Sequence, residues 1–293
     1  MYLPGYDIPI WDVLVFYWRG ITRGVLTYRA SAIAFNFFLV IVPTILFLVT
    51  LIPFITTPGF QDNLFDFLDD MIPAGIFDLI EGTIKEVLSR PRNDMLSLTF
   101  IMALYFSTNG IDAIMESFHH GYYKIKKRSW LHQRLIALFL LLTLTVLGLI
   151  SVALLMFGKS IINTIGNIEG FREGLTYYSL KILQWVITIW NILLSMSLLF
   201  YFGQRKDKGI SRFRFFSPGA IFSTALFILG GILLKMYFEN ITRYNLLYGS
   251  FGSLIVFLIW IYYNSLIILI GYELNSAIRR IKMLQEKKLN MKL

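Results

Sequence analysis

The chain has 293 residues, of which 56% are hydrophobic and only 15% are charged, and its formal net charge at pH 7 is +9. Soluble domains are about 45–50% apolar and about 25% charged, so this composition indicates an integral membrane protein and excludes a disordered chain or an ordinary nucleic-acid-binding domain. The absence of cysteine excludes disulfide scaffolds, thiol catalysis and cysteine-based metal sites.

The first predicted element is an interfacial helix over residues 8–28. Trp11, Leu14 and Trp18 are spaced for one helical face, while Arg19 lies on another. Such a segment suits a membrane surface, with indole rings at the depth of the headgroups and arginine directed toward anionic lipid. No signal peptide is expected, because prolines and aspartates interrupt any apolar run over residues 4–12.

Six stretches that are almost free of charge follow, and about 20 apolar residues suffice for one helical crossing. None of them alternates with the two-residue period of a membrane barrel. Pro43 lies inside the first stretch and is expected to kink it. The sequence therefore predicts an all-α, polytopic membrane protein with one domain over 1–293 and six transmembrane helices, at about 31–55, 95–114, 135–157, 179–203, 216–237 and 248–275.

Lys and Arg are unevenly distributed between the predicted loops. Nineteen of the 27 precede the first span, connect spans two to three and four to five, or lie in the tail, whereas six lie on the other side. The positive-inside rule then predicts that both termini are cytoplasmic.

The long loop on the predicted outer side covers residues 56–94. Its acidic residues outnumber its basic ones, and its apolar residues recur at helical spacing on either side of Pro73. We expect two short amphipathic helices that form an acidic cap. No ligand spacing of the EF-hand type occurs there, so a solvated structural cap is favoured over a cation site.

A stripe of polar residues follows one face of the fourth predicted span. Lys181, Gln184, Thr188, Asn191 and Ser195 recur every three or four residues. At 100° per residue they fall within a sector of about 80°. Two interpretations stay open, namely hydrogen bonding between packed helices and the wall of a hydrated groove.

Three asparagines in other spans are further candidates for this groove. They are Asn36 in the first span, and Asn264 and Asn275 in the sixth, which are about 20° apart on a helical wheel. Lys181 and Lys235 lie near the outer ends of their spans and are candidates for contact with an anionic headgroup. Snorkelling of Lys235 to the interface is the alternative.

Three acidic residues near the predicted inner ends of spans are candidates for proton coupling: Asp112, Glu116 and Glu273. Asp112 and Glu116 are four residues apart and precede a basic cluster at 124–128, so surface pairing with that cluster is their alternative. For Glu273 the alternative is a place beside the inner headgroups.

Motifs for catalysis or metal binding do not occur in the sequence. His119, His120 and His132 lie in or near one basic loop, and there is no H-E-x-x-H, G-x-S-x-G or Walker A pattern. We therefore expect no enzyme activity, no cofactor and no metal. The basic inner loops are explained by orientation, so membrane lipids and envelope proteins are the expected partners rather than nucleic acid. The oligomeric state stays open.

Several motifs resemble one protein family. Tyr248–Gly252, Leu258–Tyr262 and Gly271–Asn275 are similar to its pattern YG-x-hydrophobic…LhWLY…GAELN, and Tyr28–Phe35 with Val42-Pro43 is similar to its first span. The pattern marks the YihY/virulence factor BrkB family of bacterial inner-membrane proteins, and Tyr272 replaces the small residue that is usual there. The resemblance implies a multi-pass inner-membrane protein with both termini inside. Members have been named ribonuclease BN, but the sequence lacks the His/Asp cluster that such a nuclease requires.

Two functions fit these features. The first is a transporter or flippase-like protein that moves an anionic lipid or amphiphile for envelope biogenesis. In this function the lipid headgroup moves along the polar stripe. The second is a non-transporting scaffold that recruits envelope-assembly partners, in which the stripe serves helix packing.

Overall fold

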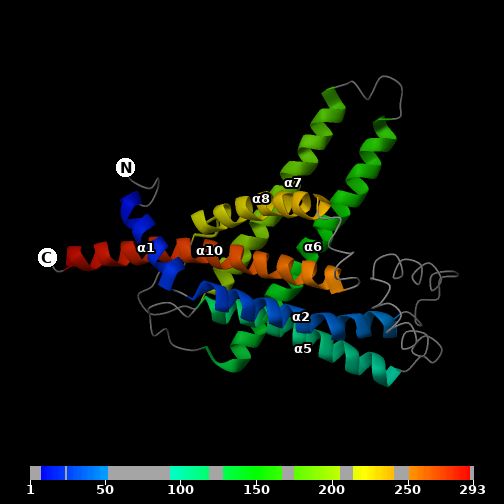
Figure 1. Ribbon diagram of the computed structural model, residues 1–293, viewed down its shortest axis with the longest axis horizontal. Coiled ribbons are helices and arrows are strands. Elements are labelled where there is room, and N and C mark those ends of the chain that lie inside the picture. The colour runs from blue at the N-terminus through cyan, green and yellow to red at the C-terminus, as the bar shows by residue number, and fades with distance from the viewer. Residues whose placement is uncertain are drawn as a thin grey trace. The chain divides into compact units, whose positions relative to one another are not determined.

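The structure is a computed structural model, and it describes residues 8–23, 25–51, 93–118, 128–166, 175–204, 214–240 and 251–290. Within these ranges every regular element is an α-helix (Figure 1). The seven helices are α1 (Ile10–Arg23), α2 (Leu26–Leu51), α5 (Asn93–Ser117), α6 (Trp130–Gly166), α7 (Leu175–Gly203), α8 (Pro218–Asn240) and α10 (Phe251–Asn290). The prediction of a helical protein is confirmed.

Five of these helices are long and apolar enough to cross a membrane: Leu26–Phe47, Leu96–Ser117, Trp130–Ser151, Tyr178–Gly203 and Leu254–Gln285. A helix rises 1.5 Å per residue, so the 22 residues of Leu26–Phe47 extend about 33 Å, enough for the hydrocarbon layer. The predicted span at 216–237 corresponds to α8, whose apolar part Pro218–Leu234 is shorter. The count of six spans and the cytoplasmic position of both termini stay predictions.

The ends of the helices differ from the predicted segments in two places. The N-terminal segment divides, because α1 ends at Arg23 and Val25 has a left-handed φ of 49° before α2 begins. The helix α2 contains Pro43 as expected, and the kink there stays a prediction. The helix α10 has 40 residues and extends well past the predicted end at residue 275. The acidic cap predicted over 56–94 lies outside the described residues, apart from the first two residues of α5.

The chain divides into two compact units. One contains α1, α6, α7, the first half of α8 and the second half of α10, and the other contains most of α2 and α5 with the remaining halves of α8 and α10. In the second unit α2 and α5 are antiparallel, since Thr50 pairs with Thr99 through their hydroxyls at 3.0 Å and Phe37 lies 3.7 Å from a Cβ built on Gly110. The single domain over 1–293 stays a prediction.

Candidate functional site

The polar stripe lies on α7 and part of it faces α6, its antiparallel neighbour (Figure 1). Gln184 donates from Nε2 to the Leu154 carbonyl at 2.9 Å, and Asn191 donates from Nδ2 to the Leu147 carbonyl at 2.8 Å. The two donors are seven residues apart on α7, and their acceptors are seven residues apart on α6 in the opposite direction of the chain. The two bonds therefore join the helices at points two turns apart. They are hydrogen bonds between packed helices, as the first interpretation of the stripe expects.

Asn191 is the most enclosed amide of the stripe, at 5% exposure. Its Nδ2 also donates to Ser151 Oγ at 2.7 Å, so both donor hydrogens are used within α6. Its Oδ1 is buried and has no hydrogen-bond partner within the described part of the chain. An unpaired oxygen in such a place is costly, and it can accept a hydrogen bond from a molecule that enters the site.

The other members of the stripe have local roles. Thr188 is buried and donates to the Gln184 carbonyl, and the half-buried Ser195 donates to the Asn191 carbonyl, both one turn back along α7. Lys181 is exposed at the start of the stripe. The stripe therefore combines an exposed cation, two residues bonded to their own helix and two amides bonded to α6, and its use as a groove stays a prediction.

Replacing Asn191 with alanine should lower the free energy of unfolding by roughly 1–2 kcal/mol, because it removes two hydrogen bonds to α6 and such bonds contribute about 0.6 kcal/mol each on average in a membrane protein. Ser151→Ala should cost less. Because the two side chains bond each other, the double variant should be less destabilised than the sum of the single variants. SDS-induced unfolding of the purified protein measures this coupling, and Ser195→Ala is the control. Strictly additive losses would contradict the contact.

The three further groove candidates have different environments. Asn36 and Asn264 are half-buried, and each donates to the carbonyl four residues earlier on its own helix, at 2.8 Å. Asn275 is 2% exposed, accepts from the Gly219 N–H at 2.8 Å and donates to Ser217 Oγ at 2.8 Å. Asn275 therefore binds the first turn of α8.

The first turn of α8 explains why an asparagine is needed there. Ser217 immediately precedes α8, and its Oγ accepts from the Ala220 N–H at 3.3 Å, while Pro218 occupies the first helical position, where no N–H is required. The Gly219 N–H is another of the donors that a helix start leaves without an intrahelical partner. Asn275 from α10 supplies its acceptor.

The same region of α8 and α10 forms a close helix crossing. A Cβ on Gly271 would overlap Ser223 Oγ and lie 2.7 Å from the Gly219 carbonyl oxygen. Ser223 donates to the Ile267 carbonyl at 3.1 Å across this crossing. Glycine at 271 and 219 therefore lets the two backbones meet, as small residues do between membrane helices.

Tyr272 belongs to a buried aromatic cluster beside the crossing. It is 2% exposed and stacks on Phe118 with ring centroids 4.0 Å apart, and Phe200 packs edge-on against both rings. The residue that departs from the family pattern thus joins the ends of α5 and α7 to α10. Sequence reasoning missed this role, because no spacing along the chain relates these three rings.

Glu273 faces α1 within the same unit. Its Oε2 lies 3.0 Å from the place that a Cβ on Gly20 would occupy. Burial raises the pKa of Tyr17, one turn away on α1, to about 12, and the Glu273 carboxylate adds to that shift. Glu273 therefore lies at a contact between α10 and α1.

The remaining candidates are placed as follows. Asp112 and Glu116 are half-buried in the last two turns of α5. In the basic cluster proposed as their partner, only Arg128 is described, and it donates from Nη2 to the carbonyls of Phe202 and Gln204 at the end of α7. This places a cation at the negative end of the helix dipole. The side chain of Lys235 lies outside the described residues.

Metal ligands do not gather in the described ranges. No group of three or more His, Asp or Glu side chains there could hold an ion. His132 is exposed at the start of α6, and His119 and His120 lie outside the described residues. Nuclease chemistry that depends on a metal cluster has no support in this part of the chain.

Comparison with known proteins adds to this geometry. The family model described as Virulence factor BrkB matches residues 17–292. The chain belongs to the virulence factor BrkB family. The match extends from the second half of α1 to the end of α10, and it confirms the resemblance inferred from the Gly271–Asn275 segment and the first span.

Relatives of this BrkB-family chain come from several bacteria. A Bacillus subtilis protein named "Putative ribonuclease-like protein YfkH" is 27% identical over 262 residues, which cover 88% of this chain and 92% of that relative. The UPF0761 membrane protein MS0032 of Mannheimia succiniciproducens is 26% identical over 284 residues, covering 94% and 92%. A UPF0761 membrane protein of Coxiella burnetii is 22% identical over 274 residues, covering 86% and 87%. No solved structure matches the chain significantly.

Sequence comparison and helix composition lead to the same class of protein. The BrkB-family match, the UPF0761 membrane-protein relatives and the five long apolar helices agree that the chain is a membrane protein. The ribonuclease term in the name of the Bacillus subtilis relative gains no support from the described residues of this BrkB-family chain.

Proposed function

We propose that this BrkB-family protein is a transporter or flippase-like protein of the bacterial inner membrane that moves an anionic lipid or amphiphile during envelope biogenesis. It acts without a cofactor and is neither an enzyme nor a ribonuclease. Its partners are membrane lipids and envelope proteins, not nucleic acid. The observation that carries the proposal is the buried Oδ1 of Asn191, which has no hydrogen-bond partner among the described residues and lies two turns or more beyond the exposed Lys181.

The chemistry of the stripe supports this function. An exposed ammonium attracts an anionic headgroup, and a buried amide oxygen accepts a hydrogen bond from a hydroxyl, an amine or a carried water. Polar side chains on a spanning helix lower the cost of moving a headgroup through hydrocarbon, while the acyl chains stay in lipid. In this scheme Lys235 assists Lys181, and Asp112, Glu116 or Glu273 exchanges protons on the opposite side.

The test is a leaflet-exchange assay on the protein reconstituted in vesicles that contain a fluorescent anionic lipid. Lys181→Ala should reduce the exchange rate about tenfold, which equals the loss of about 1.4 kcal/mol of interaction with the headgroup. Lys181→Arg keeps the cation and should retain most of the rate. A neutral lipid should be insensitive to both changes.

Asn191→Leu should also slow exchange, but it removes bonds to α6. Ser151→Ala is the matched control, because it disturbs the same interhelical contact and leaves the Asn191 oxygen in place. Exchange that is absent from the wild type, or unchanged in Lys181→Ala and Asn191→Leu, would refute the transport function.

A scaffold that recruits envelope-assembly partners without transport is the second candidate. The bonds from Gln184 and Asn191 to α6 favour it, since they use stripe residues for packing. In a scaffold, stripe substitutions lower stability and leave no transport to lose, and photocrosslinkers at residues 60–90 should capture envelope proteins.

A further inference from the structure

The helix α1 has two apolar faces. Trp11, Leu14 and Trp18 are 74%, 49% and 67% exposed, and they fall within a sector of about 60°. Val13, Phe16 and Gly20 point to the opposite side. Amphipathic helices on soluble proteins bury one apolar face and expose a polar one, so a second apolar face with two exposed indoles requires a separate explanation.

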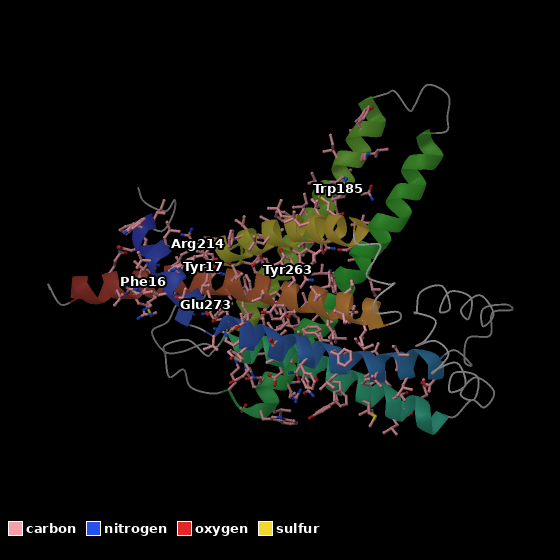
Figure 2. All side chains as sticks on the ribbon, in the orientation of Figure 1. Phe16, Tyr17, Trp185, Arg214, Tyr263 and Glu273 are labelled. Carbon is pink, nitrogen blue, oxygen red and sulfur yellow. The ribbon has the colours of Figure 1, made fainter. Side chains whose placement is uncertain are left out.

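The opposite face holds α1 firmly on its own unit. Val13 packs with Ile278 and Ile281 of α10 in a buried cluster that Phe16 and Leu274 adjoin. The Tyr17 ring meets Phe222 of α8 edge-on, with centroids 6.4 Å apart. Figure 2 labels Phe16 and Tyr17 on α1 near Glu273 of α10. Because this face is occupied, the indoles of Trp11 and Trp18 are directed away from the unit.

The contact with α10 also determines the depth of α1 in a membrane. The apolar stretch Leu254–Gln285 has 32 residues, but about 20 cross the hydrocarbon layer. Charged residues resume at Glu273 and continue with Arg279, Arg280 and Lys282, so the end of α10 lies among the headgroups. The helix α1 packs against 274–281, and it therefore lies at the same level.

One cation of α1, Arg19, borders the exposed indole face. Arg19 is exposed on the flank of α1, about a quarter of a turn from Trp11 and Trp18. On the opposite face, the Arg280 guanidinium of α10 lies 4.9 Å from the centroid of the Phe16 ring. Tryptophan partitions to the depth of the headgroups, and arginine beside it favours anionic lipid.

We propose that the Trp11–Leu14–Trp18 face of α1 is a docking surface for the anionic headgroup layer of the membrane, held at that depth by the contact of α1 with α10. The proposal is independent of transport, since a scaffold would use the same surface. A second copy of the chain or a protein partner on this face is the alternative that the experiment distinguishes.

The full chain has no cysteine, so single cysteines give unique labelling sites. We would attach a nitroxide spin label to Leu14→Cys, which keeps both indoles, and to Trp18→Cys. Asp12→Cys on the polar flank is the matched control on the same helix. The labelled proteins are reconstituted in phosphatidylcholine vesicles with or without phosphatidylglycerol, and the collision rates with oxygen and with a water-soluble nickel complex are measured.

Labels at positions 14 and 18 should collide more with oxygen than with the nickel complex, and the label at position 12 should show the reverse. Adding phosphatidylglycerol should increase the depth of the spin label at position 14 below the membrane surface, and Arg19→Gln should abolish that increase. High nickel accessibility at positions 14 and 18 would show a face in water and overturn the proposal. Low accessibility to both reagents would show a protein on this face and overturn it equally.

Discussion

Replacing Gly271 with alanine is expected to destabilise the protein by roughly 2–4 kcal/mol. The added methyl group would overlap Ser223 Oγ and press on the Gly219 carbonyl, which is backbone and cannot move aside. Overpacking of this kind costs about 1–3 kcal/mol, and displacement of Ser223 also breaks its hydrogen bond to the Ile267 carbonyl, worth about 1 kcal/mol. The thermal unfolding midpoint in detergent micelles and the SDS midpoint measure the loss.

Gly148→Ala is the control for the change at 271. A Cβ on Gly148 meets no described atom within 4 Å, so this variant should be neutral or gain up to about 1 kcal/mol from helix propensity. Equal stability of the two variants would contradict the close crossing of α8 and α10.

Replacing Asn275 with alanine has the second largest expected effect, again roughly 2–4 kcal/mol. The substitution leaves the buried Gly219 N–H without its acceptor and removes the donor to Ser217 Oγ. Each buried polar group that loses its partner costs about 1–3 kcal/mol. Equilibrium unfolding in SDS, followed by circular dichroism, measures the change.

Two variants distinguish the loss of the contact between Asn275 and the start of α8 from the general effect of losing an amide side chain. Asn264→Ala removes the same side chain from the same helix, but that amide bonds only to its own helix, so the loss should stay below about 1 kcal/mol. Asn275→Asp keeps an acceptor for the Gly219 N–H, and a carboxylate is favourable at a helix start. Its loss of stability should therefore lie between those of Asn264→Ala and Asn275→Ala. Comparable losses of stability for Asn264→Ala and Asn275→Ala would contradict the role of Asn275 at the start of α8.

The long helices were predictable because their cause is local. A run of about 20 apolar residues is driven into hydrocarbon whatever the rest of the chain does, and its backbone must then bond within the helix. The predicted spans at 179–203 and 248–275 accordingly match α7 and most of α10. The division near Val25 was missed, because one left-handed residue interrupts a pattern that is otherwise helical.

The candidate site was predictable only in part. The spacing of the stripe placed Gln184 and Asn191 on one polar face of the helix, but their bonds to Leu154 and Leu147 depend on the register between two helices. Asn264 and Asn275 share one face of α10 by spacing, yet one bonds within its own helix and the other caps α8. A helical wheel shows which side a residue takes and carries no information about its partner.

The sequence by itself determined that this is a helical membrane protein of the BrkB family, because hydrophobicity and motif spacing act along the chain. Only the tertiary structure decided that Asn275 meets Gly219, 56 positions away, that Tyr272 stacks on Phe118, and that α1 lies against 274–281. The physical reason is that these contacts arise from the packing of helices far apart in the chain. Their energy depends on shape and register, which composition and periodicity do not encode.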